Sequence, residues 1–295
     1  METIIQQQRE TIYQKTFDLL EATNTNWSVE KKPLITEEGL KTESFGNFRK
    51  DDNTWLGTTT KSYTIIQNSK LAETLIEASI DITDKFKGGL LEKGKKVYYQ
   101  AQLSDEIVDN DTIKRFVTAL NSHDGTSSIG FGFTNMVVAC QNSFHVAMKE
   151  VQKFRHFANS YERIKIAEQE IKKILLEESM VMNNFKRMAD VKITDKAKKK
   201  VIANLFDIEE NDFQKEENKF STRKINQMKK FSEILEAELY SHGNTLWGLF
   251  NAVTWKTNHE DVKKENNLQN IMYGTGYNKN IQTYKILVDS LPKNI

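Results

Sequence analysis

The spacing of apolar residues changes once along the chain, and this change limits the folds that the sequence can adopt. Before about residue 159, short apolar runs alternate with glycine, asparagine and aspartate, which is typical of antiparallel strands and tight turns. Beyond that point apolar residues recur at helical spacing and strand-like runs disappear. An α+β fold is therefore predicted, in which a small antiparallel sheet of hairpins packed with helices is followed by a mainly helical C-terminal half.

This change divides the chain into three predicted regions. They are an N-terminal helix and extended arm, an antiparallel sheet with its helix, and a helical region, over residues 1–60, 61–158 and 159–295. A helix is predicted over 1–25, and the turn-rich residues 26–60 are predicted to be partly mobile. A β-like run over 61–68 precedes a helix that the side chain of Asn68 or Ser69 is expected to cap.

The first predicted hairpin turns at Lys93 and Gly94, where glycine supplies the positive φ that a tight turn needs. Its second strand alternates in character, because successive side chains of a strand point to opposite faces. One face is predicted to join the core and consists of Val97, Tyr99, Ala101 and Leu103. The opposite face is basic, aromatic and amide-bearing, and consists of Lys96, Tyr98, Gln100 and Gln102.

The second predicted hairpin covers residues 113–135, with the sequence His-Asp-Gly-Thr at 123–126 as its turn. Gly125 is expected to adopt a positive φ, and Asp124 to accept hydrogen bonds from backbone N–H groups across the turn. His123 is expected to stand exposed at the tip. The returning strand is predicted to bury the apolar residues that alternate with its glycines, Ile129, Phe131 and Phe133.

Helices are predicted for most of the remaining chain. The first covers residues 136–158 and carries Cys140 on its apolar stripe. Those of the C-terminal half cover residues 161–190, 194–206, 219–240, 244–260 and 281–291.

Composition excludes several classes of protein. The 42 lysines and arginines are nearly balanced by 41 aspartates and glutamates, so the chain is not a strongly basic nucleic-acid binder and any anion-binding surface must arise from local segregation of charge. A single cysteine excludes an intrachain disulfide and fits a reducing compartment. The N-terminus lacks the features of a signal peptide, and no apolar run approaches about 20 residues, so a soluble cytoplasmic protein without a membrane partner is expected.

Motifs for catalysis or cofactor binding are absent. A metal site could be imagined from His123, Asp124, Cys140 and His145, but their spacing matches no zinc pattern. Cys140 lies on an apolar stripe, where a thiol behaves as a small hydrophobe. The glycine-containing segments lack the pattern of a phosphate-binding loop. We therefore expect no metal, no cofactor and no enzymatic activity.

Basic residues interleaved with aromatic residues suggest a nucleic-acid surface. Lys96 and Tyr98 share a predicted strand face, and Lys149, Lys153 and His156 could line its rim. Such a groove would attract phosphates and stack bases on tyrosine. An ordinary solvated sheet face explains the same residues, and both interpretations stay open at this point.

Several motifs resemble those of a phage- and plasmid-like family, domain of unknown function 932, over roughly residues 55–260. The similarity includes "SYTIIQNSKLAETL" and "GGLLEKGKKVYYQAQL", and the matching positions of its later motifs are Asn121, Ser122, His123, Asp124, Gly125, Cys140, Gln141, Asn142, Asn251, Ala252, Val253, Thr254 and His259. Phe250 departs from an expected leucine, and Val138 and Ala139 stand where an arginine is expected nearby. Any DNA contact made by that arginine in relatives is absent here.

The order of hairpins, strands and helix is also similar to the core of single-strand annealing proteins of the RecT and Rad type. That similarity implies a non-catalytic recombination protein that binds single-stranded DNA as a homo-oligomeric ring or filament, in the host cytoplasm if a phage encodes it. The residues expected to contact nucleic acid are Lys95, Lys96, Tyr98, Arg115, Asn121, His123, Lys149, Lys153 and Arg155. Asp124 and Gly125 are expected to shape the turn.

Two other functions remain open. The chain could be a phage protein-interaction module that acts on a host or replication protein, which requires an exposed apolar patch around Trp247, Phe250 and Trp255. It could also be a nuclease or hydrolase, which requires carboxylates clustered in space.

Overall fold

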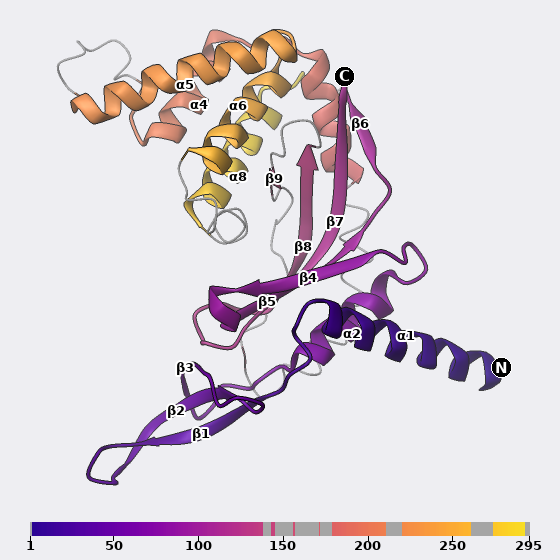
Figure 1. Cartoon of the computed structure of the whole chain (residues 1–295). Helices are drawn as coiled ribbons and strands as arrows, with labels where there is room; N and C mark the ends of the chain where they lie inside the picture. The colour runs from indigo at the N-terminus through magenta and orange to yellow at the C-terminus, as the bar shows by residue number, and fades with distance from the viewer. Residues whose placement is uncertain are drawn as a thin grey trace. The chain divides into compact units, whose positions relative to one another are not determined.

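The computed structural model describes residues 2–137, 143, 144, 156, 171, 179–210, 220–260 and 274–292 (Figure 1). The chain separates into two compact units that interleave in sequence. Unit 1 consists of Met1–Leu103, Phe116–Phe133 and Met148–Leu176. Unit 2 consists of Ser104–Arg115, Thr134–Ala147 and Glu177–Ile295. The α+β class predicted from the sequence is confirmed, with helices dominating the C-terminal half.

Unit 1 begins with a helix and a small sheet. Helix α1 (Glu2–Ala22) confirms the predicted N-terminal helix. Three antiparallel strands follow in the order β1-β2-β3, Val29–Ile35, Lys41–Arg49 and Trp55–Thr60. The expectation of a partly mobile arm over 26–60 is therefore wrong. Residues 26–60 are rich in glycine and asparagine, but they form a sheet whose inward-facing residues, such as Asn47 and Leu56, are fully buried.

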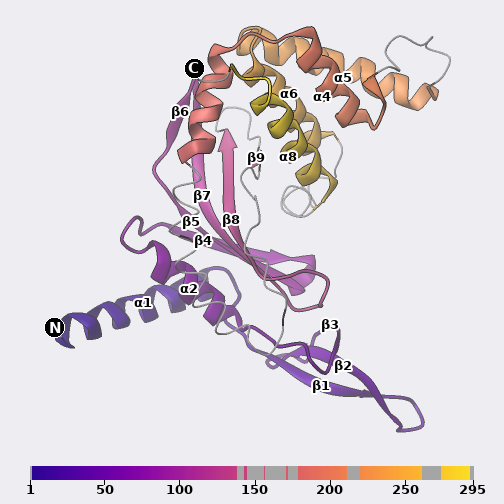
Figure 2. The ribbon, with the colours of Figure 1, turned by 180° about the vertical axis from the view of Figure 1, so that it is seen from behind.

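Helix α2 (Asn68–Ser79) lies beside α1 in both views of the ribbon (Figures 1 and 2). Its apolar residues Leu71, Leu75 and Ile76 are fully buried, so the helical spacing predicted this element correctly. The predicted cap is wrong, because Gln67 occupies the N-cap position and no side chain caps the helix. The amide of Gln67 instead bonds both N (2.8 Å) and O (2.9 Å) of Val29, which ties the start of β1 to α2. The predicted β-like run over 61–68 is also wrong, since these residues form no strand.

The second sheet follows the order β4-β5-β7-β8-β9, with β6 paired to β7. Strands β4 (Phe86–Leu91) and β5 (Lys96–Gln102) form the first predicted hairpin, and Lys93 and Gly94 in its turn have φ of 57° and 88°. Strands β7 (Asp111–Ser122) and β8 (Gly130–Val137) form the second. The face of β5 predicted to join the core does so, because Val97, Tyr99 and Ala101 are all fully buried.

The helix predicted over 136–158 is wrong at its start. Strand β8 continues to Val137, and Ser143–Phe144 forms the short strand β9, which pairs with Asn135 and Met136. A continuous apolar run does not distinguish a buried strand from a buried helix, and this ambiguity explains the error. The rest of the predicted helix lies outside the described residues except His156.

Unit 2 contains β6 (Glu106–Val108) and helices α4 (Asp195–Phe206), α5 (Thr222–Ser241), α6 (Leu246–His259) and α8 (Thr275–Val288) (Figure 2). Thr194, Ser221 and Thr245 cap α4, α5 and α6 by accepting a backbone N–H three residues on, which satisfies one orphan donor at each helix start. Residues 179–190 are helical as predicted. Among the described residues, no helix is both long and apolar enough to cross a membrane.

Candidate functional site

The His-Asp-Gly-Thr segment forms the tight turn that the sequence predicts. Gly125 has a φ of 77°, a conformation that residues with a Cβ atom rarely adopt. The carboxylate of Asp124 accepts hydrogen bonds from the backbone N of Thr126 (2.9 Å), from its hydroxyl (2.7 Å) and from the hydroxyl of Ser122. Burial alone would raise the pKa of Asp124, but these donors and the nearby charge of Lys96 together outweigh burial and lower it. All three donors meet the same oxygen, Oδ1, so this atom of Asp124 holds the turn together.

The turn packs tightly against β3. A Cβ atom built on Gly57 would lie 2.5 Å from the Cα of Asp124, so only glycine allows this approach. Nearby, the Asn47 side chain of β2 donates to the carbonyl of His123 (2.7 Å). The first sheet of unit 1 therefore covers the turn, and the turn is not a free hairpin tip.

The expected exposure of His123 is wrong, because its side chain is fully buried. Its Nε2 lies 2.8 Å from Oδ1 of Asn68, and its ring centroid lies 5.5 Å from that of Trp27. The Asn68 amide nitrogen donates to the carbonyl of Thr25 (3.0 Å), so Oδ1 accepts and Nε2 of His123 carries the proton. Burial lowers the pKa of His123 to about 3, so the ring is neutral at physiological pH.

Asn121 is equally inaccessible. Its side chain is fully buried and donates to the carbonyl of Ile66 (2.8 Å). This bond links β7 to the segment that precedes α2. Neither Asn121 nor His123 presents a surface to a nucleic-acid strand, so the geometry assigns both a structural place.

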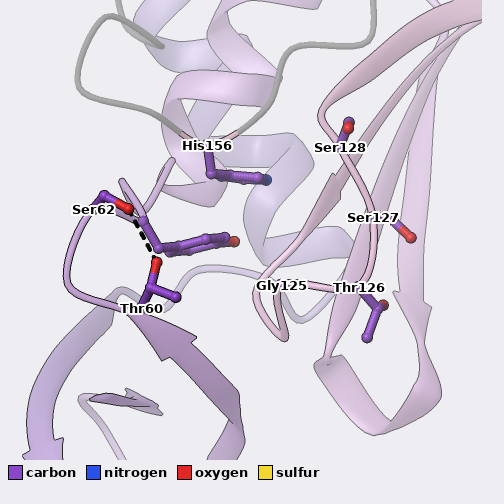
Figure 3. Close-up of a pocket in the computed structure, with 8 residues that line it drawn as sticks. Thr60, Ser62, Gly125, Thr126, Ser127, Ser128 and His156 are labelled. Carbon is purple, nitrogen blue, oxygen red and sulfur yellow. Dashed lines mark hydrogen bonds between the residues drawn. The ribbon is translucent and has the colours of Figure 1, made fainter. Parts of the chain in front are cut away.

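A polar pocket of about 240 Å³ lies beside the turn (Figure 3). Hydroxyl groups dominate its walls, together with one tyrosine, one histidine and the backbone of Gly125. The lining residues are Thr60, Ser62, Tyr63, Gly125, Thr126, Ser127, Ser128 and His156. They come from three segments of unit 1 that are distant in sequence.

His156 and Tyr63 form one side of this pocket. Their rings are stacked, with centroids 4.4 Å apart and an angle of 19° between planes. Nδ1 of His156 lies 2.9 Å from the carbonyl of Thr64, and the Tyr63 hydroxyl donates to the carbonyl of Ser122 (2.5 Å). Because a carbonyl only accepts, Nδ1 of His156 carries the proton and Nε2 is a bare acceptor. Burial lowers the pKa of His156, so the ring stays neutral.

Two of the basic residues predicted to bind phosphate, Lys96 and Arg115, are engaged within the protein. Lys96 is only 6% exposed and forms an ion pair with Glu92. In unit 2, Arg115 donates to the carbonyl and hydroxyl of Ser104, both at 2.7 Å. The predicted groove of Lys96 and Tyr98 with Lys149, Lys153 and His156 at its rim stays a prediction. Lys149, Lys153 and Arg155 lie outside the described residues.

Tyr98 and Lys95 remain partly exposed. The Tyr98 ring lies against β4, where a Cβ atom built on Gly89 would meet it at 3.2 Å. The ammonium group of Lys95 lies 5.0 Å from the ring centroid of Trp55, which is 49% exposed. Lys95 is thus the predicted basic residue that meets an exposed aromatic ring.

Trp55 belongs to a basic and aromatic surface that the sequence did not reveal. It is the cross-strand partner of Phe48, and directly paired residues point to the same face of a sheet. The Phe48 ring covers the backbone of Gly46, and the Lys32 ammonium lies 5.5 Å from its centroid. We call these four side chains the stacking platform: Lys32, Phe48, Trp55 and Lys95. Lys32, Phe48 and Trp55 belong to β1, β2 and β3, and Lys95 lies in the turn before β5.

The turn and the residues that line the pocket fall within the part of the chain that a known family model matches. The model describes a domain of unknown function (DUF932) and matches residues 55–274. The chain belongs to the DUF932 family. No curated protein and no solved structure matches it. The similarity to RecT- and Rad-type annealing proteins stays a prediction.

The DUF932 region also includes the aromatic residues of α6. The exposed apolar patch that a protein-interaction module would require there cannot include Trp247 and Phe250, which are fully buried and pack on Phe185 at 5.1 and 5.3 Å between centroids. Trp247 Nε1 also donates to Asp111 (2.9 Å). Helix α6 is buried almost all round, and its buried residues include polar ones such as Asn251 and Thr257.

A histidine among carboxylates lies elsewhere in unit 2. His242 Nδ1 lies 3.4 Å from Asp111 and 3.9 Å from Asp109, and its Nε2 lies 3.3 Å from Glu238. The hydrogen bond to Glu238 and the charge of Asp111 raise the pKa of His242. No group of three or more His, Cys, Asp or Glu within the described parts of the chain has the arrangement of a metal site. Cys140 and His145 lie outside those parts.

Proposed function

We propose that the chain is a non-catalytic DNA-binding protein of phage recombination type, which holds single-stranded DNA and promotes annealing. The observation that carries this proposal is the stacking platform, in which the paired rings of Phe48 and Trp55 each lie near a lysine ammonium. Exposed aromatic rings stack on unpaired bases, and lysines beside them neutralise phosphates.

The platform favours single strands over duplex DNA. Bases in a duplex are already stacked and paired, so Trp55 can offer a new stacking partner only to an unpaired base. Lys95 supplies the main positive charge, since Lys32 also pairs with Glu30 at 2.7 Å. The resemblance to annealing proteins adds a homo-oligomer, a ring or filament in which platforms of successive copies hold one strand.

Binding of a labelled single-stranded oligonucleotide, measured by fluorescence anisotropy over a range of salt concentrations, tests this proposal. Trp55→Ala should weaken binding about tenfold, because stacking on an aromatic side chain contributes about 1–3 kcal/mol per base. Lys95→Gln should reduce the log–log salt slope by about 0.7, the value for one phosphate contact on a single strand. Tyr240→Ala is the matched control, since Tyr240 is a 93% exposed aromatic residue of unit 2.

Two further readouts separate annealing from simple binding. The wild-type protein should accelerate pairing of complementary oligonucleotides, and negative-stain images should show rings or filaments on DNA. Both oligonucleotides should remain intact in the presence of Mg²⁺. Absence of single-strand binding at low salt, or equal binding by the wild type and Trp55→Ala, contradicts the proposal.

A further inference from the structure

The pocket beside the turn has the properties of a ligand site that the stacking platform does not use. Its volume of about 240 Å³ is somewhat below the range of about 300–1,000 Å³ typical of pockets for drug-sized molecules, so it suits a small ligand. Thr60, Ser62, Thr126, Ser127 and Ser128 line it; the hydroxyl groups of Thr60 and Ser62 hydrogen-bond to each other, and that of Thr126 donates to Asp124. A hydroxyl group can donate or accept a hydrogen bond, so these residues can bind an uncharged ligand that carries donors, acceptors or both.

The imidazole of His156 favours a ligand that carries a hydrogen-bond donor. Its Nδ1 faces the carbonyl of Thr64, and its Nε2 is buried with no hydrogen-bond partner among the described residues. The ring extends toward the segment that carries Ser127 and Ser128 (Figure 3). A buried acceptor without a donor is unfavourable, and a ligand that brings an N–H group to it removes this penalty.

Charge at the pocket argues against a phosphate. His156 is neutral, and Asp124 places a carboxylate close to the turn that forms the opposite wall. An anion would face a lone pair of His156 and the field of this carboxylate. The ligand should therefore be neutral and should present a hydrogen-bond donor.

From these features, we propose that the pocket holds a single pyrimidine base of the imide type, thymine or uracil. The imide N3–H donates to Nε2 of His156, and hydroxyl groups of the pocket donate to the two carbonyl oxygens that flank it. Cytosine presents a ring nitrogen acceptor at the same position, where it would meet the lone pair of His156. The base comes from a free nucleoside or from an unpaired position of a strand, and the second source rests on the proposed function.

Binding of free thymidine, followed by NMR titration up to its solubility limit, tests the pocket without reference to DNA. Thymidine should bind, and N3-methylthymidine, which lacks only the imide proton, should bind at least tenfold more weakly. His156→Phe keeps a ring to stack on Tyr63 but removes the acceptor, and it should abolish this difference. His259→Phe is the matched control, because His259 is an exposed histidine of unit 2 next to an aromatic ring, that of Trp255.

The double variant Ser127→Ala/Ser128→Ala removes hydroxyl donors without altering His156, and it serves if His156→Phe fails to fold. It should weaken thymidine binding and leave the melting temperature unchanged. Equal binding of thymidine and its N3-methyl derivative, or no binding of thymidine, overturns the proposal. Preferential binding of 2-deoxyribose over the base overturns it as well.

Homopolymeric oligonucleotides distinguish the two sources of the base. A preference for oligo(dT) over oligo(dC) that His156→Phe removes shows a base delivered by a strand. Thymidine binding without any binding of oligo(dT) keeps the pocket as a nucleoside site and contradicts only the proposed function. If the protein binds single strands but neither binds thymidine nor prefers any base, only the proposal that the pocket holds a base is contradicted.

Discussion

The pKa shifts of the histidines have opposite directions in the two units. In unit 1, His123 and His156 are buried as neutral rings, and burial lowers the pKa of both. In unit 2, His242 lies among Asp109, Asp111 and Glu238, and these carboxylates raise its pKa. A neutral imidazole retains a lone pair on one ring nitrogen, whereas the carboxylates around His242 favour its protonated form.

Aromatic residues show the same contrast. Trp55 of unit 1 is 49% exposed beside Lys95, while Trp247 of unit 2 is fully buried against Phe185. An exposed tryptophan adds nothing to a core and is available for stacking, whereas a buried one contributes mainly to stability. Substitutions in unit 2 should therefore affect folding, and those on the platform should affect binding.

The largest effect is expected for Trp247→Ala. Truncation of a fully buried tryptophan costs about 3–5 kcal/mol, and here it also removes the donor to the buried carboxylate of Asp111. Hydrogen exchange should show lost protection in α5 and α6, while the folded fraction still binds single-stranded DNA. Equal loss of protection in α1 and α2 would show that the two units do not differ in this way.

His123→Ala should have the next largest effect, in unit 1. The change leaves a cavity and removes the hydrogen bond to Asn68, so a loss of about 2–4 kcal/mol in unfolding free energy is expected. Urea unfolding measures this loss, with the exposed His259→Ala as control. An unchanged midpoint would restore the exposed turn-tip interpretation that the sequence first suggested.

Lowering the pH should change the stability of the two units in opposite directions, by less per pH unit than either substitution. The folded pKa of His123 is about 3, below its usual value, so the unfolded chain binds more protons as the pH falls from about 6.5 toward 3. Unit 1 should then lose up to about 1.4 kcal/mol per pH unit for each such histidine. The contribution of His242 has the opposite sign, because its raised pKa gives stability that is fully present below about pH 6.5 and lost as the pH rises through its folded pKa.

Hydrogen exchange corrected for intrinsic rates can follow this difference between pH 7 and pH 5. Peptides of α2 and β5 should lose protection on acidification, and those of α5 and α6 should keep it. In His123→Ala the acid sensitivity of unit 1 should decrease. Loss of protection in unit 2 alone would reverse the assignment of neutral and charged histidines.

Local patterns predicted the elements that depend on local sequence. Helical spacing identified α2, α5 and α6, and the Asp124–Gly125 turn followed from the conformations that these residues favour. The first sheet was missed because Gly46 and Gly57, which read as turn formers, instead allow a ring and a neighbouring backbone to approach closely. The contact of Gly57 with Asp124 joins residues far apart in the chain, so local sequence does not reveal it.

The same limit explains the errors at the site. Whether His123 is exposed depends on Asn68 and Asn47, which lie 55 and 76 positions away. The pocket and the Phe48–Trp55 pair also arise only when separate segments meet. The order of basic and aromatic residues along the chain pointed to β5 and β7, and it did not reveal that Lys95 lies beside Trp55 of β3.

The most direct test of the central claim is quenching of Trp55 fluorescence by a single-stranded oligonucleotide. The chain has four tryptophans, of which Trp27 and Trp247 are buried. If a base stacks on Trp55, titration with oligo(dT) should quench wild-type emission, and Trp55→Phe should lose most of that quenching while still binding DNA. Binding with the same quenching in Trp55→Phe, or binding with no quenching in the wild type, would show that the platform is not where the strand lies.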